Sequence, residues 1–210
     1  MLIKLICFDI DQTLIEENTW YKLNVALGMS PEEDEKYFKL YREGKLSYQN
    51  WIKVIFDIYR SKGRASFENI DKIIADYTYR TGAKETVDYL KDKGYEISLI
   101  SGGMDMLVDK IANDLGVGLT AANISFVFDE NNYLKEMISV GDESETKIRH
   151  LSNFCRKIGI DFDECAAVGD GANDIGLFLK TGHGITFRGS EIEDKAWKVI
   201  EKLTDLKELF

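Results

Sequence analysis

The chain has 210 residues, of which 44% are hydrophobic, and its formal net charge at pH 7 is −10. That length suits one α/β domain or one domain with an insertion, and the acidic balance argues against a nucleic-acid partner held through its phosphates. Lys4 interrupts the only apolar run near the N-terminus, and no stretch approaches membrane-spanning length. We therefore expect a cytoplasmic protein without a membrane partner.

The first predicted strand ends in two carboxylates. Residues 5–8 form an apolar run, and Asp9 and Asp11 follow it. Side chains two residues apart in an extended chain point to the same side, and like charges at the exit of a buried strand repel each other and are costly to desolvate. A hard cation such as Mg²⁺, which prefers oxygen ligands, would relieve that repulsion. Taken alone, the stretch also fits an ordinary strand-to-loop boundary capped by Asp and Thr.

Residues 15–80 contain no convincing strand and are rich in aromatic and charged residues at helical spacing. Ser30, Pro31 and Glu33 are typical of a helix start with a capping box, and two further apolar faces with a period near 3.6 cover residues 46–59 and 66–78. Helices placed directly after the first strand are most simply an inserted subdomain. We therefore expect a helical cap over residues 15–80 and an α/β core domain over residues 1–14 and 81–210.

From residue 81 onward, predicted helices and strands alternate. The strands fall at residues 95–100, 165–168 and 184–187, and the helices at residues 84–93, 104–115, 144–158 and about 191–201. Residues 123–140 indicate a hairpin that turns at Asn131 and Asn132. Apolar strands that alternate with helices are typical of a parallel sheet covered on both faces. The expected fold class is therefore α/β: a Rossmann-like parallel sheet with helices on both faces, an inserted α-helical cap and a small β-hairpin.

Polar groups follow three of these strands, and ligands of open parallel sheets bind outside the carboxyl ends of the strands. Asp9 and Asp11 follow the first strand, and Ser101 and Gly102 follow the second. The hydroxyl and the glycine N–H suit an anion at a helix N-terminus, although an ordinary strand–helix turn explains them too. Residues 169–174 follow a third strand but lack the third glycine of a dinucleotide loop. We therefore do not expect a dinucleotide cofactor.

Four short motifs carry a family resemblance. They are Asp9-Ile10-Asp11-Gln12-Thr13, Ser101, Lys147 and Gly169-Asp170-Gly171-Ala172-Asn173-Asp174. Their order and spacing resemble those of the haloacid dehalogenase superfamily, and the resemblance covers the whole chain, including a helical cap after the first strand. Within that superfamily the chain looks most like the phosphoserine phosphatase group, with the nearest runs at residues 43–46, 100–103 and 167–175.

The resemblance implies a Mg²⁺-dependent phosphomonoesterase that acts on a small phosphorylated metabolite through an aspartyl-phosphate. Asp9 would be the nucleophile and Asp11 the general acid and base. Mg²⁺ would be held by Asp9, Asp170 and the backbone carbonyl of Asp11. The groups that would bind the phosphoryl oxygens are Ser101, the Gly102 N–H, Lys147 and Asn173.

Two supporting roles and two other functions also follow from the resemblance. Asp174 would orient Lys147 or a water at the metal, and Thr13 would fix the loop with its hydroxyl near Asp11. A phosphotransferase or phosphomutase could use the same aspartyl-phosphate, and a non-catalytic phosphate-binding regulatory protein could keep the same loops. We expect a monomer or a homodimer.

The resemblance is incomplete in the cap, where the substrate is selected. The glutamate that binds the substrate ammonium in phosphoserine phosphatases corresponds to Asn18 here. Their carboxylate-binding arginine corresponds to Ile55, which cannot make a bidentate contact with a carboxylate. Arg42 and Tyr48 are further candidates for specificity in the cap. Phosphoserine is therefore one possible substrate among other small phosphate esters.

Overall fold

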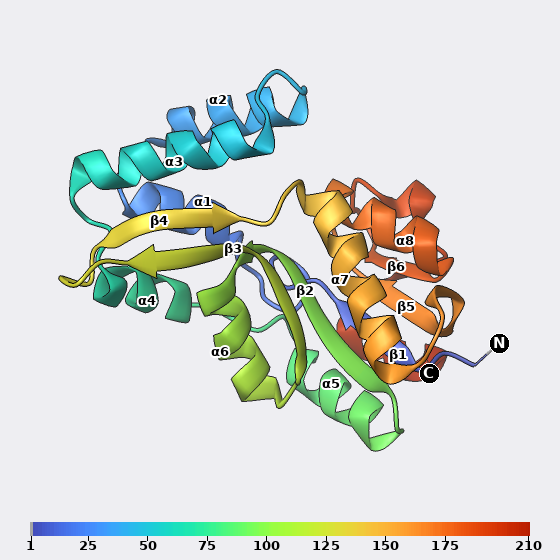
Figure 1. The fold of residues 1–210 in the computed structure, drawn as a ribbon. Helices are drawn as coiled ribbons and strands as arrows, with labels where there is room; N and C mark the ends of the chain where they lie inside the picture. The colour runs from blue at the N-terminus through green and yellow to red at the C-terminus, as the bar shows by residue number, and fades with distance from the viewer. Residues whose placement is uncertain (1) are drawn as a thin grey trace.

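A seven-stranded sheet forms the centre of the computed structural model, which describes residues 2–210 (Figure 1). Its strand order is β4-β3-β2-β1-β5-β6-β7. The strands are β1 (Leu5–Phe8), β2 (Glu96–Met104), β3 (Leu119–Phe128), β4 (Leu134–Ser139), β5 (Cys165–Val168), β6 (Gly184–Phe187) and β7 (Lys198–Ile200). All neighbours pair in parallel except β3 and β4, which are antiparallel. The predicted Rossmann-like α/β fold is confirmed.

Helices cover both faces of the sheet, so the central strand is buried on both sides. Leu5 and Cys7 of β1 lie in a core with residues of α7 (Glu143–Ile158) and α8 (Ile175–Thr181). Ile6 and Phe8 point to the opposite core, which includes residues of α5 (Ala83–Asp92), α6 (Asp105–Leu115) and α9 (Leu206–Leu209). This double burial explains why β1 is a continuous apolar run.

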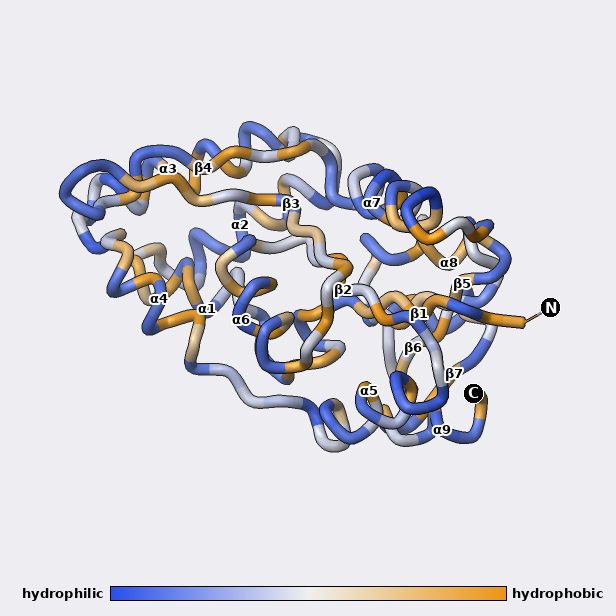
Figure 2. The backbone as a smooth tube through the Cα atoms, turned by 60° about the horizontal axis from the view of Figure 1, so that its bottom comes forward, coloured by the Kyte–Doolittle hydropathy of each residue, from blue (hydrophilic) through white to orange (hydrophobic). Residues whose placement is uncertain are grey.

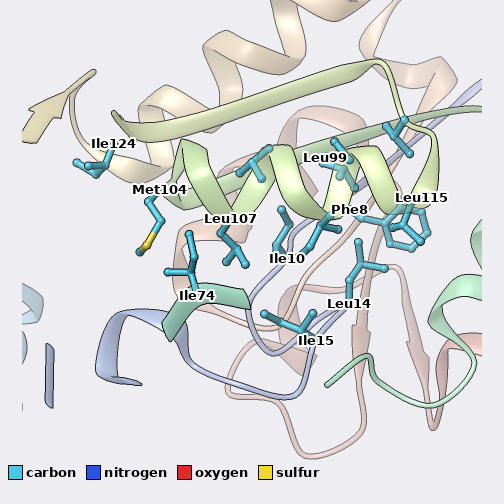
Figure 3. Close-up of a cluster of buried hydrophobic side chains, with 14 of the residues drawn as sticks. Phe8, Ile10, Leu14, Ile15, Ile74, Leu99, Met104, Leu107, Leu115 and Ile124 are labelled. Atoms are coloured by element: carbon cyan, nitrogen blue, oxygen red, sulfur yellow. The ribbon is translucent and has the colours of Figure 1, made fainter. Parts of the chain in front are cut away.

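The core on the α5 and α6 side of the sheet can be followed in Figures 2 and 3. Figure 2 shows hydrophilic and hydrophobic stretches that alternate along α5 and α6, as expected for amphipathic helices. Figure 3 shows Phe8, Leu99, Leu107 and Leu115 gathered between the strands and α6. The core therefore lies directly beneath the carboxyl end of β1.

Four helices separate β1 from α5: α1 (Thr19–Ala26), α2 (Pro31–Arg42), α3 (Tyr48–Lys62) and α4 (Phe67–Ala75). The predicted capping box of α2 is confirmed, because Glu33 N donates to Ser30 Oγ at 3.2 Å and Ser30 N donates to Glu33 Oε2 at 2.9 Å. The insertion enters and leaves the core as two adjacent segments, since Ile15 pairs with Tyr79 in an antiparallel bridge.

The β3–β4 hairpin lies against the inserted helices (Figure 1). Phe67 N donates to Asn132 O at 2.7 Å, and Leu134 N donates to Ala65 O at 2.8 Å. The turn falls where the sequence predicts it, with Asn132 at a positive φ of 60°. These contacts attach the tip of the hairpin to the segment between α3 and α4.

Two expectations about the elements were wrong. The predicted C-terminal helix near residues 191–201 is replaced by a short 3₁₀ turn (Glu193–Lys195) and β7, because Val199 and its neighbours pair with β6. This sheet pairing outweighs the helix-forming composition of the segment. In addition, β2 runs on to Met104, so Ser101 and Gly102 lie at the end of the strand and not in a strand–helix turn. None of the helices described between residues 2 and 210 is long and apolar enough to cross a bilayer.

Candidate active site

The site lies at the carboxyl ends of the three central strands. β1 pairs with β2 on one side and with β5 on the other, so the connections diverge at β1 and leave a crevice there. Asp9 directly follows β1, and its N–H donates to Val168 O of β5 at 2.9 Å. Ser101 lies in the last part of β2, which ends at Met104, and Asp170 comes shortly after β5. The topology therefore brings together three motifs at the carboxyl ends of neighbouring strands.

Lys147 of α7 lies beneath this crevice, with only 1% of its side chain exposed. Its Nζ is 2.7 Å from Asp9 Oδ1 and 2.6 Å from Asp174 Oδ1. Burial alone would lower the pKa of Lys147, but the charges and hydrogen bonds of Asp174 and Asp9 more than compensate, so its pKa lies above the usual value. Lys147 is therefore a buried ammonium that holds two carboxylates.

Carboxylates outnumber ammonium groups here. Carboxylate oxygens of Asp9, Asp170 and Asp174 lie within 4.8 Å of one another. Burial, opposed by the charge of Lys147, raises the pKa of Asp9 well above its usual value. Burial and then the charge of Asp174 raise the pKa of Asp170 to about 6. One ammonium does not neutralise three carboxylates, so this donor set fits a divalent cation with a preference for oxygen ligands.

Asp11 occupies a different position from the carboxylates around Lys147. Thr19 N, at the start of α1, donates to Asp11 Oδ1 at 2.7 Å. Burial raises the pKa of Asp11, although the hydrogen bonds from Thr19 partly oppose this. A neighbouring expectation was wrong: the Thr13 hydroxyl donates to Asp170 Oδ1 at 3.3 Å and does not bond near Asp11. The left-handed turn at Gln12, with φ of 53°, directs Thr13 toward the loop that follows β5.

The predicted phosphate-binding groups line one cavity of about 830 Å³ together with Asp9, Asp11 and Asp170. These groups are Ser101, Gly102 and Asn173, whereas Lys147 lies beneath the lining. A Cβ at Gly102 would lie 2.9 Å from Glu143 Cδ and 3.2 Å from Asn173 Nδ2, so only glycine fits there without a shift of its neighbours. Gly169 leaves room for Asp174 in the same way, since a Cβ added at this position would lie 2.3 Å from Asp174 Cγ.

Glu143, the first residue of α7, also belongs to the site, although it was not predicted from the sequence. Its side chain is 9% exposed, lines the cavity and accepts a hydrogen bond from Asn173 Nδ2 at 3.0 Å. Burial raises the pKa of Glu143 to about 7, and the hydrogen bond from Asn173 partly opposes this. Glu143 precedes Lys147 by four residues, so the two share a helix face. That spacing is the signal that could have revealed Glu143.

The four cap candidates occupy different environments. Asn18 and Arg42 line the cavity. Asn18 Oδ1 accepts a hydrogen bond from Tyr21 N and so caps α1. The Arg42 guanidinium donates two hydrogen bonds to the Glu191 carboxylate, at 3.0 and 3.1 Å. Tyr48 is buried and donates to Gly102 O at 3.4 Å. Ile55, which corresponds to the carboxylate-binding arginine of the resemblance, is fully buried and does not line the cavity, so it is not placed to select the substrate.

Comparisons with known proteins support the family resemblance that the sequence motifs indicate. The family model for haloacid dehalogenase-like hydrolases matches residues 3–180. A phosphoserine phosphatase of Methanocaldococcus jannaschii is 35% identical over 98% of this chain and 95% of its own length. One of Streptococcus thermophilus is 27% identical over 96% of both chains.

Solved structures agree with the sequence relatives. A structure titled as a phospho-aspartyl intermediate analogue of phosphoserine phosphatase superposes with a TM-score of 0.81 at 32% identity and covers 99% of both chains. A substrate-bound phosphoserine phosphatase complex also has a TM-score of 0.81, at 31% identity, and covers 100% of this chain and 97% of the other. The chain belongs to the haloacid dehalogenase-like hydrolases and is a phosphatase of the phosphoserine phosphatase-like group.

Proposed function

We propose that the protein is a Mg²⁺-dependent phosphomonoesterase that forms an aspartyl-phosphate on Asp9. One observation carries this proposal: Lys147 fixes the Asp9 carboxylate at 2.7 Å, at the carboxyl end of the central strand and in the same cavity as the phosphate-binding groups. A carboxylate held in this way is positioned to attack a phosphorus atom bound above it.

Asp9 and Asp11 divide the chemistry between them. The Asp9 carboxylate attacks phosphorus and a P–O bond forms, while the bond to the leaving alkoxide breaks and Asp11 donates a proton to it. Burial raises the pKa of Asp11, which favours the protonated form needed for this step. Asp11 then accepts a proton from the water that attacks the aspartyl-phosphate, which releases inorganic phosphate and regenerates Asp9.

The remaining groups bind the phosphoryl oxygens. The Ser101 hydroxyl, the Gly102 N–H and the Lys147 ammonium supply donors, and Asn173 has a second amide hydrogen besides the one that bonds Glu143. Asp174 holds Lys147 in place at 2.6 Å. Asp9, Asp170 and the backbone carbonyl of Asp11 would hold Mg²⁺, which supplies charge neutralisation between the nucleophile and the phosphate.

The inserted residues 15–80 are the proposed cap over this site. Arg42 supports this role, because it bonds from α2 to Glu191 of the core domain and both residues line the cavity. The β3–β4 hairpin contacts the insertion through Phe67 and Leu134, so we assign the tip of the hairpin to the cap as well. The relatives are named for phosphoserine, but Asn18 and Ile55 do not supply the amino-acid contacts expected for that substrate.

The test is the variant Asp9→Asn, with Asp163→Asn on an exposed turn as the matched control. We expect Asp9→Asn to abolish turnover of p-nitrophenyl phosphate while circular dichroism stays native, because a neutral amide is a poor nucleophile. Mass spectrometry of the quenched wild type should find a phosphate adduct on the peptide that contains Asp9. Multiple turnover by purified Asp9→Asn would exclude Asp9 as the nucleophile.

A further inference from the structure

The arginines that line the cavity already have partners. Arg42 makes a bidentate contact with the Glu191 carboxylate, and Arg188 Nε donates to Glu201 Oε1 at 3.0 Å. Arg80 donates to the backbone carbonyl of Gln12. Within residues 2–210, the lining therefore offers no arginine without a partner to a carboxylate on the substrate. An amino-acid phosphate, by contrast, needs a cationic group in the site to bind its carboxylate.

Three acidic side chains that line the same cavity lack a cationic partner among the described residues. Asp34 accepts from Asn24 Nδ2 at 2.6 Å, Asp142 lies 3.5 Å from the Tyr41 hydroxyl, and Glu143 accepts from Asn173. None of these three carboxylates pairs with a lysine or arginine of the described chain. A substrate with a cationic group would gain from them, whereas a second anion on the substrate would be repelled.

An aromatic wall adjoins these acids. Trp20 of α1, Phe38 and Tyr41 of α2 and Trp51 of α3 all line the cavity. Tyr41 and Trp51 stack with ring centroids 5.1 Å apart and an angle of 3° between the planes. Trp20 and Phe38 flank Trp51 at 5.6 and 6.0 Å. The Tyr41 hydroxyl lies 3.5 Å from Asp142 Oδ2, so the wall adjoins this carboxylate, and Asp34 and Glu143 line the same cavity.

Aromatic faces beside carboxylates are the chemistry that recognises organic ammonium ions. We propose that the leaving alcohol of the substrate carries an alkylammonium group and no carboxylate, and that the aromatic wall and the Asp34, Asp142 and Glu143 carboxylates bind that group. This inference rests on the proposed phosphomonoesterase function. Hydrolysis consumes one water and releases the ammonium alcohol and inorganic phosphate.

A pair of isosteric esters tests the role of the positive charge. Phosphocholine and 3,3-dimethylbutyl phosphate differ only in that a carbon replaces the quaternary nitrogen. We expect kcat/KM for phosphocholine to be about tenfold or more above the value for the neutral isostere. We expect an advantage of the same size over phosphoserine. A smaller advantage over either compound overturns the inference.

Failure of the inference and failure of the proposed function give different results. An enzyme that hydrolyses p-nitrophenyl phosphate but does not prefer phosphocholine contradicts only the inference. If no ester is hydrolysed, calorimetric binding of the same isosteric pair to the Mg²⁺-loaded protein still decides it. Tighter binding of phosphocholine supports the alkylammonium site, and equal binding overturns it.

Two variants locate the recognition. Tyr41→Leu removes part of the wall, and Tyr37→Leu on the same helix is the control because Tyr37 does not line the cavity. Asp142→Asn removes one charge but keeps a residue that caps α7 well. We expect Tyr41→Leu and Asp142→Asn each to lower the ratio of phosphocholine to isostere by about threefold or more, within the range of a single cation contact. A ratio that both variants leave unchanged overturns the assignment.

Discussion

Replacing Lys147 by methionine should strongly destabilise the metal-free protein. The substitution keeps most of the side-chain volume but leaves Asp9 and Asp174, whose side chains are 7% and 1% exposed, without their ammonium partner. Removing one partner of a buried ion pair costs about 3–5 kcal/mol, because the remaining charge is buried and unpaired. We expect a loss of that size in the free energy of unfolding, since both contacts are short and buried.

The pH dependence of this loss identifies its cause. Burial already raises the pKa of Asp9, and removal of the opposing charge of Lys147 should raise it further. A carboxyl whose folded-state pKa is raised destabilises the protein above that pKa and not below its unfolded value of about 4. The cost of Lys147→Met should therefore decrease as the pH falls from about 7.5 toward about 4.5.

Urea unfolding in EDTA at both pH values measures this cost. Lys195→Met is the control, because the Lys195 side chain is 49% exposed and its contact with Asp194 should contribute no more than about 1 kcal/mol. Asp9→Asn should cost less than Lys147→Met, because Lys147 keeps its contact with Asp174. A cost below about 1 kcal/mol for Lys147→Met, or one that does not depend on pH, would refute this account.

Two further variants and two changes of condition have specific expected outcomes. Asp11→Asn should slow hydrolysis of alkyl phosphates more than that of p-nitrophenyl phosphate, whose leaving group needs no proton; equal losses in kcat would argue against a general acid. EDTA should remove activity, Mg²⁺ should restore it and Ca²⁺ should inhibit. The rise in Tm with Mg²⁺ should shrink as the pH falls through the Asp170 pKa of about 6, because protons then compete with the metal. Ile55→Arg should destabilise the fold by about 3 kcal/mol or more in urea and should not increase activity on phosphoserine, because it buries a guanidinium in the core.

Features that depend on residues close together in the chain could be predicted from the sequence alone. The capping box at Ser30 and Glu33 needs only a spacing of three residues, and it forms as predicted. The apolar runs of β1 and β5 and the polar residues that follow them were equally readable, because a strand buried on both faces has a continuous apolar pattern. The topology rule for parallel sheets then placed Asp9, Ser101 and Asp170 at one edge.

The contact partner of each side chain could not be predicted in this way, because it depends on how the elements pack. Glu143 meets Asn173 because α7 packs beside the loop that follows β5, and Thr13 bonds Asp170 because the chain turns at Gln12. Ile55 lies inside the insertion because the packing of α3 buries that face of the helix. Helical periodicity shows which residues share a face of a helix, but not which element covers that face. The ion pair between Lys147 and Asp9 joins residues more than a hundred positions apart, so it forms only when α7 packs on the sheet.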